Sequence, residues 1–193
     1  MFFQISAVVI LFVFYGCYFS KMLFQRKKGI QTDQMGKGKV GAARIIEIIM
    51  KVATISVPIV EVVSICMNMV SFPIWVRYAG IVLAVLGDVI FVVSVLTMRD
   101  NWRAGVSETD KTELVTDGIY QISRNPAFLG FDLVYLGILI MFFNGILLFV
   151  TVFAMIMFQL QIVYVEENFL VTTFGNDYID YKKTVNRYLG RIK

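Results

Sequence analysis

The sequence predicts an all-α membrane protein that crosses the bilayer about five times. Hydrophobic residues make up 58% of the 193 residues and charged residues only 17%, and the mean hydropathy is +0.74. Soluble domains are about 45–50% apolar and about 25% charged. Several nearly uncharged runs also reach the roughly 20 residues that a helix needs to cross a bilayer. These observations exclude an ordinary soluble domain.

The predicted membrane helices are separated by short turns and by longer polar segments. The first helix is uncharged before Lys21, and basic residues follow it, which is the reverse of a cleavable signal peptide. Pro126 falls in the first turn of the fourth helix, where its missing N–H leaves no helical hydrogen bond unmade. Asn144 and Gly145 form a tight turn before the fifth helix. We expect one membrane domain over residues 1–193, with helices at 2–24, 45–70, 74–98, 127–143 and 146–165, a cytosolic loop at 99–126 and a C-terminal tail at 166–193.

The distribution of basic residues predicts the orientation of these helices. Five crossings with the N-terminus outside place the first linker, the loop and the tail on the inside. Every lysine and arginine except Lys51 and Arg77 then lies on or beside an inside segment, as the positive-inside rule requires. The net charge of +4 is therefore attributed to membrane topology and lipid contact, not to nucleic-acid binding.

A compact chain without an organelle retention signal favours a bacterial or archaeal cytoplasmic membrane. The oligomeric state is left open.

Few polar side chains in the predicted membrane helices suggest chemistry. The sequence has no histidine, which excludes a histidine base and the usual histidine-ligated metal centres, so no metal site is expected. Glu47 and Lys51 have the i,i+4 spacing of an ion pair near the start of the second helix. Glu61 and Asp88 lie deeper, where a charge is costly. They either line a substrate cavity or pair with polar neighbours such as Arg77.

The loop and the start of the tail carry the residues best suited to binding a ligand. The loop offers backbone donors near glycine, aromatic rings and Arg124 at the mouth of the helix bundle, which suits a nucleotide-like or carboxylate-bearing ligand. Glu166 and Glu167 follow the last predicted membrane helix and emerge on the same face. The same residues also suit a lipid-facing interfacial loop with a solvated carboxylate pair. The sequence has no P-loop and no GxGxxG motif after a strand, so a nucleotide would need another scaffold.

The order of motifs in the C-terminal half resembles the integral-membrane methyltransferases, the superfamily of isoprenylcysteine carboxyl methyltransferases and phospholipid methyltransferases. The resemblance covers roughly residues 101–190. It rests on NW at 101–102, LVTDGIYQISRNPAFLG at 114–130, EE at 166–167 and FGNDYIDY at 174–181. None of these motifs is specific by itself. The resemblance rests on the order in which they occur between the predicted helices.

The resemblance implies an S-adenosylmethionine-dependent methyltransferase (EC 2.1.1 class) whose lipid-like or prenylated acceptor enters from the bilayer. The loop between the third and fourth helices and the C-terminal tail would form the cytosolic cofactor cleft. Because the sulfonium is already activated, positioning supplies most of the acceleration. Glu166, Glu167 and Arg124 are the implied catalytic residues. The implied cofactor-binding residues are Glu113, Leu114, Val115, Gly118, Tyr120, Arg124, Asn125, Pro126, Phe128, Gly130 and Glu167.

Three positions depart from the family pattern. Glu113 and Asn125 stand where the family often has histidines, and Ile162 stands where carboxyl methyltransferases have an arginine. The missing arginine favours an amine, hydroxyl or thiol acceptor over a prenylcysteine carboxylate. The expected function is methyl transfer like that of isoprenylcysteine carboxyl methyltransferases. A phospholipid or amine N-methyltransferase, an NADPH-dependent membrane reductase and a catalytically degenerate lipid-binding scaffold are the alternatives.

Overall fold

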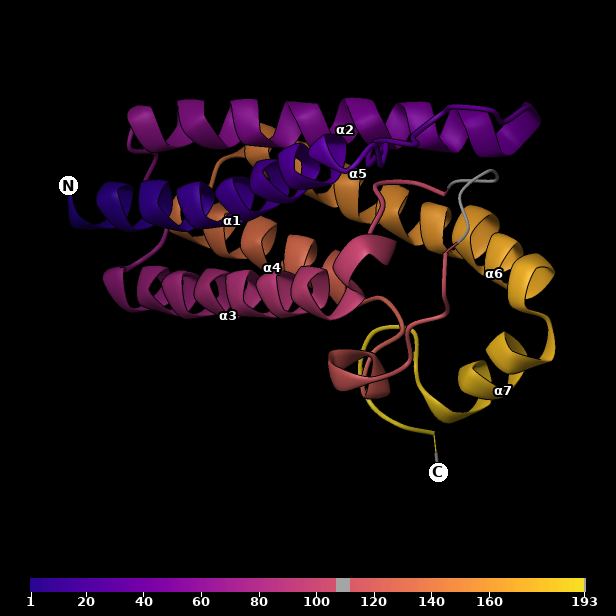
Figure 1. Ribbon diagram of the computed structural model, residues 1–193. Coiled ribbons are helices and arrows are strands. Elements are labelled where there is room, and N and C mark those ends of the chain that lie inside the picture. Colours follow the sequence, from indigo (N-terminus) through magenta and orange to yellow (C-terminus); the bar gives the residue numbers. More distant parts are fainter. Residues whose placement is uncertain (107–111, 193) are drawn as a thin grey trace.

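The computed structural model describes residues 1–106 and 112–192, so residues 107–111 of the predicted loop and residue 193 of the predicted tail lie outside the described part. Figure 1 shows the long helices running side by side, with the N-terminus at one end of the bundle and the loop and tail gathered at the other. The predicted all-α membrane fold is confirmed. The long helices are α1 (Phe2–Lys27), α2 (Gly41–Cys66), α3 (Ile74–Met98), α4 (Pro126–Met141) and α5 (Gly145–Gln161).

The loop and tail are built from short helical elements. Two single turns, η1 (Arg99–Asn101) and η2 (Gly118–Gln121), lie in the loop. The helix of α5 continues through a π-helical turn, η3 (Ile162–Glu166), into α6 (Glu167–Phe174), and α7 (Asn176–Thr184) follows. The helix that starts with α5 therefore runs past residue 165, where the sequence predicted its end.

Helix lengths agree with a membrane-spanning bundle. Among the described residues, four helical stretches are long and apolar enough to cross a bilayer: Phe2–Lys27, Gly41–Cys66, Ile74–Asn101 and Gly145–Phe174. The 16 residues of α4 span only about 24 Å, less than the roughly 30 Å of hydrocarbon. The second helix starts at Gly41 rather than at residue 45. It ends at Cys66 rather than at 70, because Asn68 adopts a φ of +47°, outside the helical region.

Small residues bring α3 and α4 into close contact. A Cβ on Gly137 would lie 2.6 Å from the Cβ of Ala84 and from the backbone oxygen of Gly80. A Cβ on Gly130 would lie 2.8 Å from the Cβ of Phe91. Membrane helices approach this closely only where such small residues face each other. The fixed position of α4 against α3 sets where the loop before α4 can lie.

The polar side chains inside the bundle do not pair as the sequence suggested. Glu61 is fully buried, and neither of its carboxylate oxygens has a hydrogen-bond partner among the described residues. Arg77 instead donates from Nε to the Met141 carbonyl at 2.9 Å and covers the Phe3 ring at 4.0 Å. Glu47 forms an ion pair with Lys39 rather than with Lys51 four residues on.

Candidate functional site

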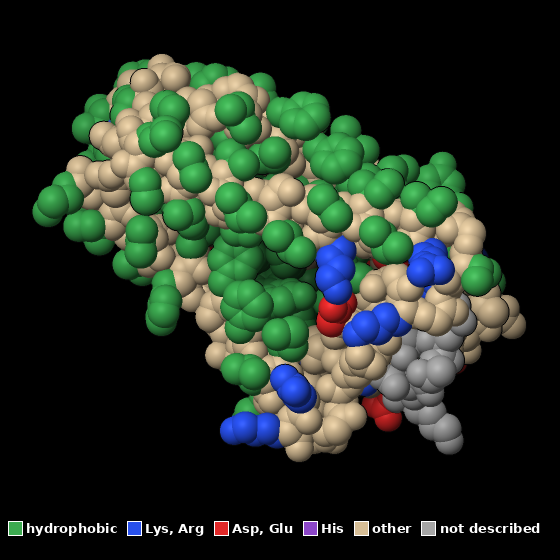
Figure 2. Space-filling view, turned by 90° about the horizontal axis from the view of Figure 1, so that it is seen from above, with side chains coloured by type: hydrophobic (Ala, Val, Ile, Leu, Met, Phe, Trp, Pro, Cys, Tyr) green, Lys and Arg blue, Asp and Glu red, His purple; other side chains and the backbone are tan. Residues whose placement is uncertain are grey.

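A cavity of about 780 Å³ opens at the end of the bundle where the loop and tail lie. One part of its wall comes from the loop, the start of α4, η3 and α7, and carries most of the polar side chains of the lining among apolar ones. The other part comes from facing sides of α1 and α2, with Tyr15, Tyr18, Thr54 and Pro58 among its residues, and is largely apolar. Figure 2 shows a hollow lined by hydrophobic side chains, with basic and acidic side chains along one edge. The cavity thus joins a polar site to the membrane-spanning part of the bundle.

The structure brings most of the predicted site residues to this cavity. Glu166 and Arg124 of the predicted catalytic group line it, and Glu167 does not. Gly118, Pro126 and Gly130 also lie off its wall, and their roles in cofactor binding remain predictions. The predicted cofactor-binding residues that line it are Glu113, Leu114, Val115, Tyr120, Arg124, Asn125 and Phe128.

The segment before α4 is held in place by the end of the tail. The backbone N–H groups of Arg124 and Asn125 donate to the carbonyls of Asn186 and Arg187 at 3.1 and 3.2 Å. The Asn125 side chain adds a hydrogen bond from Nδ2 to the Arg187 carbonyl at 3.1 Å. Pro126 then begins α4. The tail therefore fixes the backbone on which Arg124 and Asn125 stand.

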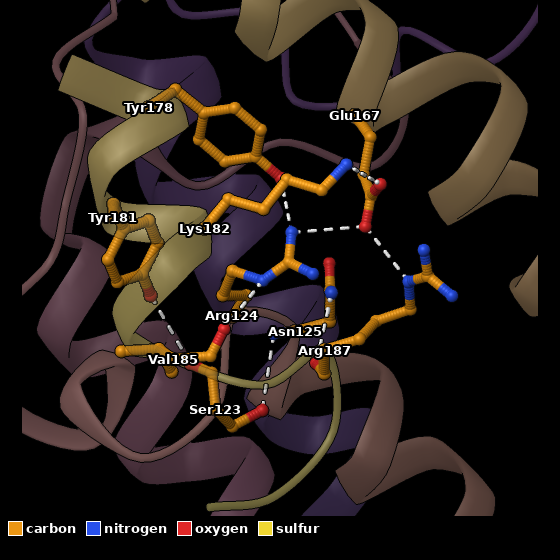
Figure 3. Close-up of polar contacts among 9 residues, drawn as sticks. All are labelled: Ser123, Arg124, Asn125, Glu167, Tyr178, Tyr181, Lys182, Val185 and Arg187. Atoms are coloured by element: carbon orange, nitrogen blue, oxygen red, sulfur yellow. Dashed lines mark hydrogen bonds and ion pairs between the residues drawn. The ribbon is translucent and has the colours of Figure 1, made fainter. Parts of the chain in front are cut away.

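Glu167 lies behind the cavity at the centre of a charged cluster (Figure 3). Its Oε1 accepts hydrogen bonds from Arg124 Nη1 at 3.0 Å and Arg187 Nε at 2.8 Å, and its Oε2 accepts from Lys182 Nζ at 2.9 Å. The hydrogen bond to Glu167 raises the pKa of the Arg187 guanidinium. We call Arg124, Glu167, Tyr178, Lys182 and Arg187 the Glu167 cluster.

Three further hydrogen bonds join α7 and the residue directly after it to the loop. Arg124 donates from Nη1 to the Tyr178 hydroxyl at 2.8 Å and from Nε to the Val185 carbonyl at 3.0 Å. The Tyr181 hydroxyl donates to the Tyr120 carbonyl at 2.6 Å. Burial raises the pKa values of the Tyr178 and Tyr181 hydroxyls, so both stay protonated and able to donate near neutral pH. These contacts hold α7 across one side of the cavity.

Glu166 and Glu167 point in different directions although they are neighbours in the chain. Successive residues of a helix are about 100° apart around its axis. Glu166 ends the π-helical turn and faces the cavity, whereas Glu167 begins α6 and faces the tail. The two carboxylates therefore cannot share one role.

Glu47 is a second buried centre, and sequence reasoning missed its part in the site. Its carboxylate accepts from the backbone N–H of Gly36 at 2.6 Å, from that of Val106 at 3.3 Å and from Gln161 Nε2 at 3.1 Å, besides its ion pair with Lys39. It thus ties the first linker, the loop and α5 together. The sequence did contain a signal for this role. A carboxylate in a membrane helix needs a partner, and the basic linker directly before α2 could supply one.

A comparison with models of protein families shows to which family the chain belongs. The model of the phospholipid methyltransferase family matches residues 75–177, more than half of the chain. The chain belongs to the phospholipid methyltransferase family. Most of the polar part of the cavity, including Glu113, Arg124 and Glu166, falls inside the matched region, and the parts of its wall from α1 and α2 fall outside it.

Individual members and relatives point to the same superfamily. A protein-S-isoprenylcysteine O-methyltransferase of Rattus norvegicus is 31% identical over 121 residues, which are 62% of this chain and 43% of the relative. Those of Dictyostelium discoideum and Tribolium castaneum are 31% and 29% identical over 117 and 113 residues, covering 60% and 58% of this chain and 48% and 40% of the relatives. The aligned part is less than half of each of these relatives.

A solved structure has the same fold as the present chain. It is that of a eukaryotic intramembrane Ras methyltransferase, an isoprenylcysteine carboxyl methyltransferase, with a TM-score of 0.57 and 20% identity. The match covers 90% of this chain and 62% of the other. The likeness therefore extends to α1 and α2, beyond the region that the family model matches.

Proposed function

We propose that this protein transfers the methyl group of S-adenosylmethionine to a hydrophobic acceptor at the membrane. The observation that carries the proposal is that one cavity connects a polar site on the loop and tail with an apolar space between α1 and α2. Its volume is in the usual range of ligand pockets, roughly 300–1,000 Å³. Membership of the phospholipid methyltransferase family and the O-methyltransferase relatives support this reaction class.

The residues at the polar end fit S-adenosylmethionine. Within the described residues, the backbone N–H groups of Leu114 and Val115 have no hydrogen-bond partner, so this edge is free to bind an adenine ring. Tyr120 and Phe169 add aromatic surface. The carboxylates of Glu113 and Glu166 supply the negative charge that favours a sulfonium or an ammonium group.

The protein's own groups have to orient the reactants and exclude water. S-adenosylmethionine supplies an activated methyl group, so no strong acid or metal is required for its transfer. The Glu167 cluster and the Tyr181–Tyr120 hydrogen bond hold α7 beside the cavity. We infer that this arrangement shields the polar end, while the acceptor's hydrocarbon part lies between α1 and α2. With the N-terminus outside, the site faces the cytosol.

The first test is binding of S-adenosylhomocysteine to the purified protein in nanodiscs, measured by isothermal titration calorimetry. We expect micromolar binding by the wild type and binding weakened about tenfold by Glu113→Gln, the loss of one charged contact. Lys183→Gln is the matched control, because Lys183 pairs with Asp180 on the outer side of α7. Absence of binding in a folded wild-type sample would refute the proposal, and tight NADPH binding in its place would favour the reductase alternative.

A further inference from the structure

Three cationic side chains of the described residues line the cavity, and they differ in how firmly the protein holds them: Lys51, Arg103 and Arg124. Arg124 forms a buried ion pair with Glu167, in which both side chains are at most 7% exposed. Arg103 donates from Nη1 to two backbone carbonyls of its own segment at 2.6 and 2.9 Å. The side chain of Lys51 is 39% exposed and is paired with Asp33, whose side chain is 29% exposed.

The ammonium group of Lys51 has hydrogen-bond donors to spare. A lysine ammonium carries three N–H donors, and the Lys51 Nζ donates to Asp33 Oδ2 at 2.5 Å. Asp33 is its one hydrogen-bond and ion-pair partner in the part of the chain that the structure describes. An oxyanion in the cavity could therefore accept hydrogen bonds from Lys51.

Lys51 lies where the two parts of the cavity meet. Asp33 belongs to the first linker, which is attached to the loop: the Gln34 N–H donates to the Ala104 carbonyl at 2.8 Å, and the Ala104 N–H donates to the Thr32 carbonyl at 2.9 Å. The residues of α2 that follow Lys51 on the cavity wall belong to its largely apolar part: Thr54, Ile55, Pro58 and Ile59. A ligand whose hydrocarbon chain lies between α1 and α2 would bring its polar group to the level of Lys51.

The Asp33–Lys51 pair is suited to exchange of partners. Ion pairs that are exposed to this degree contribute little to stability, so a ligand can replace Asp33 at low cost. Asp33 also accepts a hydrogen bond at its Oδ1 from the Met35 N–H at 3.2 Å, which it can keep when Lys51 is released. The buried Arg124–Glu167 pair does not have this freedom, because separating it would leave an uncompensated buried charge.

We infer that Lys51 is a specificity-determining residue that binds an anionic group, a phosphate or a carboxylate, next to the hydrocarbon chain of the ligand, and that Asp33 competes with this group for Lys51. The inference rests on the proposed function and adds a residue that positions the acceptor. Both residues lie outside the region 75–177 that the family model matches. The inference therefore concerns the linker and α2 of this chain, and it holds whichever atom accepts the methyl group.

Binding tests the inference without turnover. The probes are 12-bromododecyl phosphate, ionised 12-bromododecanoate and 12-bromododecanol, which share a chain whose bromine quenches tryptophan fluorescence. Trp102 is buried on the cavity wall and reports the binding, and Trp75→Phe removes the signal of the exposed second tryptophan. In nanodiscs of zwitterionic lipid we expect at least one anionic probe to bind about tenfold more tightly than the alcohol, the effect of hydrogen bonds to a charged group. The tighter of the two anionic probes identifies phosphate or carboxylate as the preferred group.

The two members of the pair should have opposite effects on this binding. Lys51→Gln removes the cation and should weaken binding of the preferred anionic probe about tenfold, with the alcohol unchanged. Asp33→Asn removes the competing carboxylate and should strengthen it about threefold or more. An ion pair with only a structural role would be broken by either substitution, and both would then shift binding in the same direction. Lys183→Gln and Asp180→Asn, in the exposed pair on α7, are the matched controls and should change nothing.

The outcomes separate this inference from the proposed function. Equal binding of the three probes by the wild type, or weaker binding in both Lys51→Gln and Asp33→Asn, would overturn the inference. Loss of S-adenosylhomocysteine binding in Lys51→Gln would also overturn it, because Lys51 would then serve the cofactor. Failure of the folded wild type to bind S-adenosylhomocysteine would instead refute the proposed function, whereas the probes report on Lys51 without any cofactor.

Discussion

At the scale of single residues, Glu167 holds the tail against the loop. Its side chain is 7% exposed and accepts hydrogen bonds from three cationic side chains that belong to the loop, to α7 and to the chain after α7. A carboxylate so placed compensates positive charges that would otherwise repel one another in a poorly solvated site. Glu167 therefore acts on the cavity through Arg124 and not by facing it.

Removing this carboxylate should destabilise the protein. Glu167→Ala leaves the buried Arg124 without its ion-pair partner, and breaking a buried pair costs about 3–5 kcal/mol. We expect a lower unfolding temperature in detergent by circular dichroism, and weaker binding of S-adenosylhomocysteine. Asp180→Ala is the control, because the Asp180–Lys183 pair lies on the surface with 72% and 69% of its side chains exposed. Equal effects of the two substitutions would contradict the role given to Glu167.

Residue roles were only partly predictable from the sequence. Arg124, Asn125 and Glu166 could be selected because they occur in a recognisable order, and they do line one cavity. The sequence could not tell which of Glu166 and Glu167 faces the cavity, since the π-helical turn before them rotates the faces of the following helix. Gly130 was assigned to cofactor binding by its place in a motif; it packs against α3, and its role in cofactor binding stays a prediction. The partners of Glu47 lie in three segments and were not predictable from helical spacing.

At the scale of elements, the packing of α3 against α4 should be sensitive to one methyl group. Gly137→Ala places a Cβ 2.6 Å from the Ala84 Cβ and 2.7 Å from the Ala84 nitrogen, so the helices must move apart. Overpacking of this kind costs about 1–3 kcal/mol. Gly16→Ala in α1 is the control, because nothing lies within 4 Å of its added Cβ. We expect only Gly137→Ala to lower the unfolding temperature.

The junction between α6 and α7 gives a prediction about the tail. Gly175 has φ +54° and ψ −125°, a conformation that side chains disfavour, although nothing lies within 4 Å of an added Cβ. Gly175→Ala should therefore cost about 1–3 kcal/mol through backbone strain alone. We expect faster proteolysis of the tail and weaker binding of S-adenosylhomocysteine. Gly145→Ala also meets open space but lies at the start of α5 with no positive φ, and it should leave both measurements unchanged.

At the scale of the whole molecule, the helical bundle was the most predictable feature. Long apolar runs bounded by turns and prolines fix the number and order of helices, and all five predicted helices are present. The observed helix ends differ by a few residues from the predicted ones where the local backbone conformation ends a helix, as the positive φ of Asn68 does after α2. The cavity was not predictable in full, because its apolar part is made by residues of α1 and α2 that carry no motif and meet the loop only in the folded chain.

The orientation of the bundle in the membrane remains a prediction, and its two cysteines offer a direct test. Cys66 is exposed at the end of α2, opposite the end that holds the cavity, whereas Cys17 is partly buried within α1. With the N-terminus outside, Cys66 lies at the outer face. A membrane-impermeant maleimide should therefore label the wild type in right-side-out vesicles and leave Cys66→Ser unlabelled.

A cysteine on the tail completes this test from the other side. Asp180 has an exposed side chain on α7, and Asp180→Cys in the Cys66→Ser background should react only in inside-out vesicles. The reverse pattern would place the cavity outside the cell, away from the cytosolic supply of S-adenosylmethionine. The distribution of basic residues predicts which side of the membrane each helix end occupies, and the fold independently places the cavity at one end of the bundle. Labelling on the expected sides would therefore support the topology and the proposed function together.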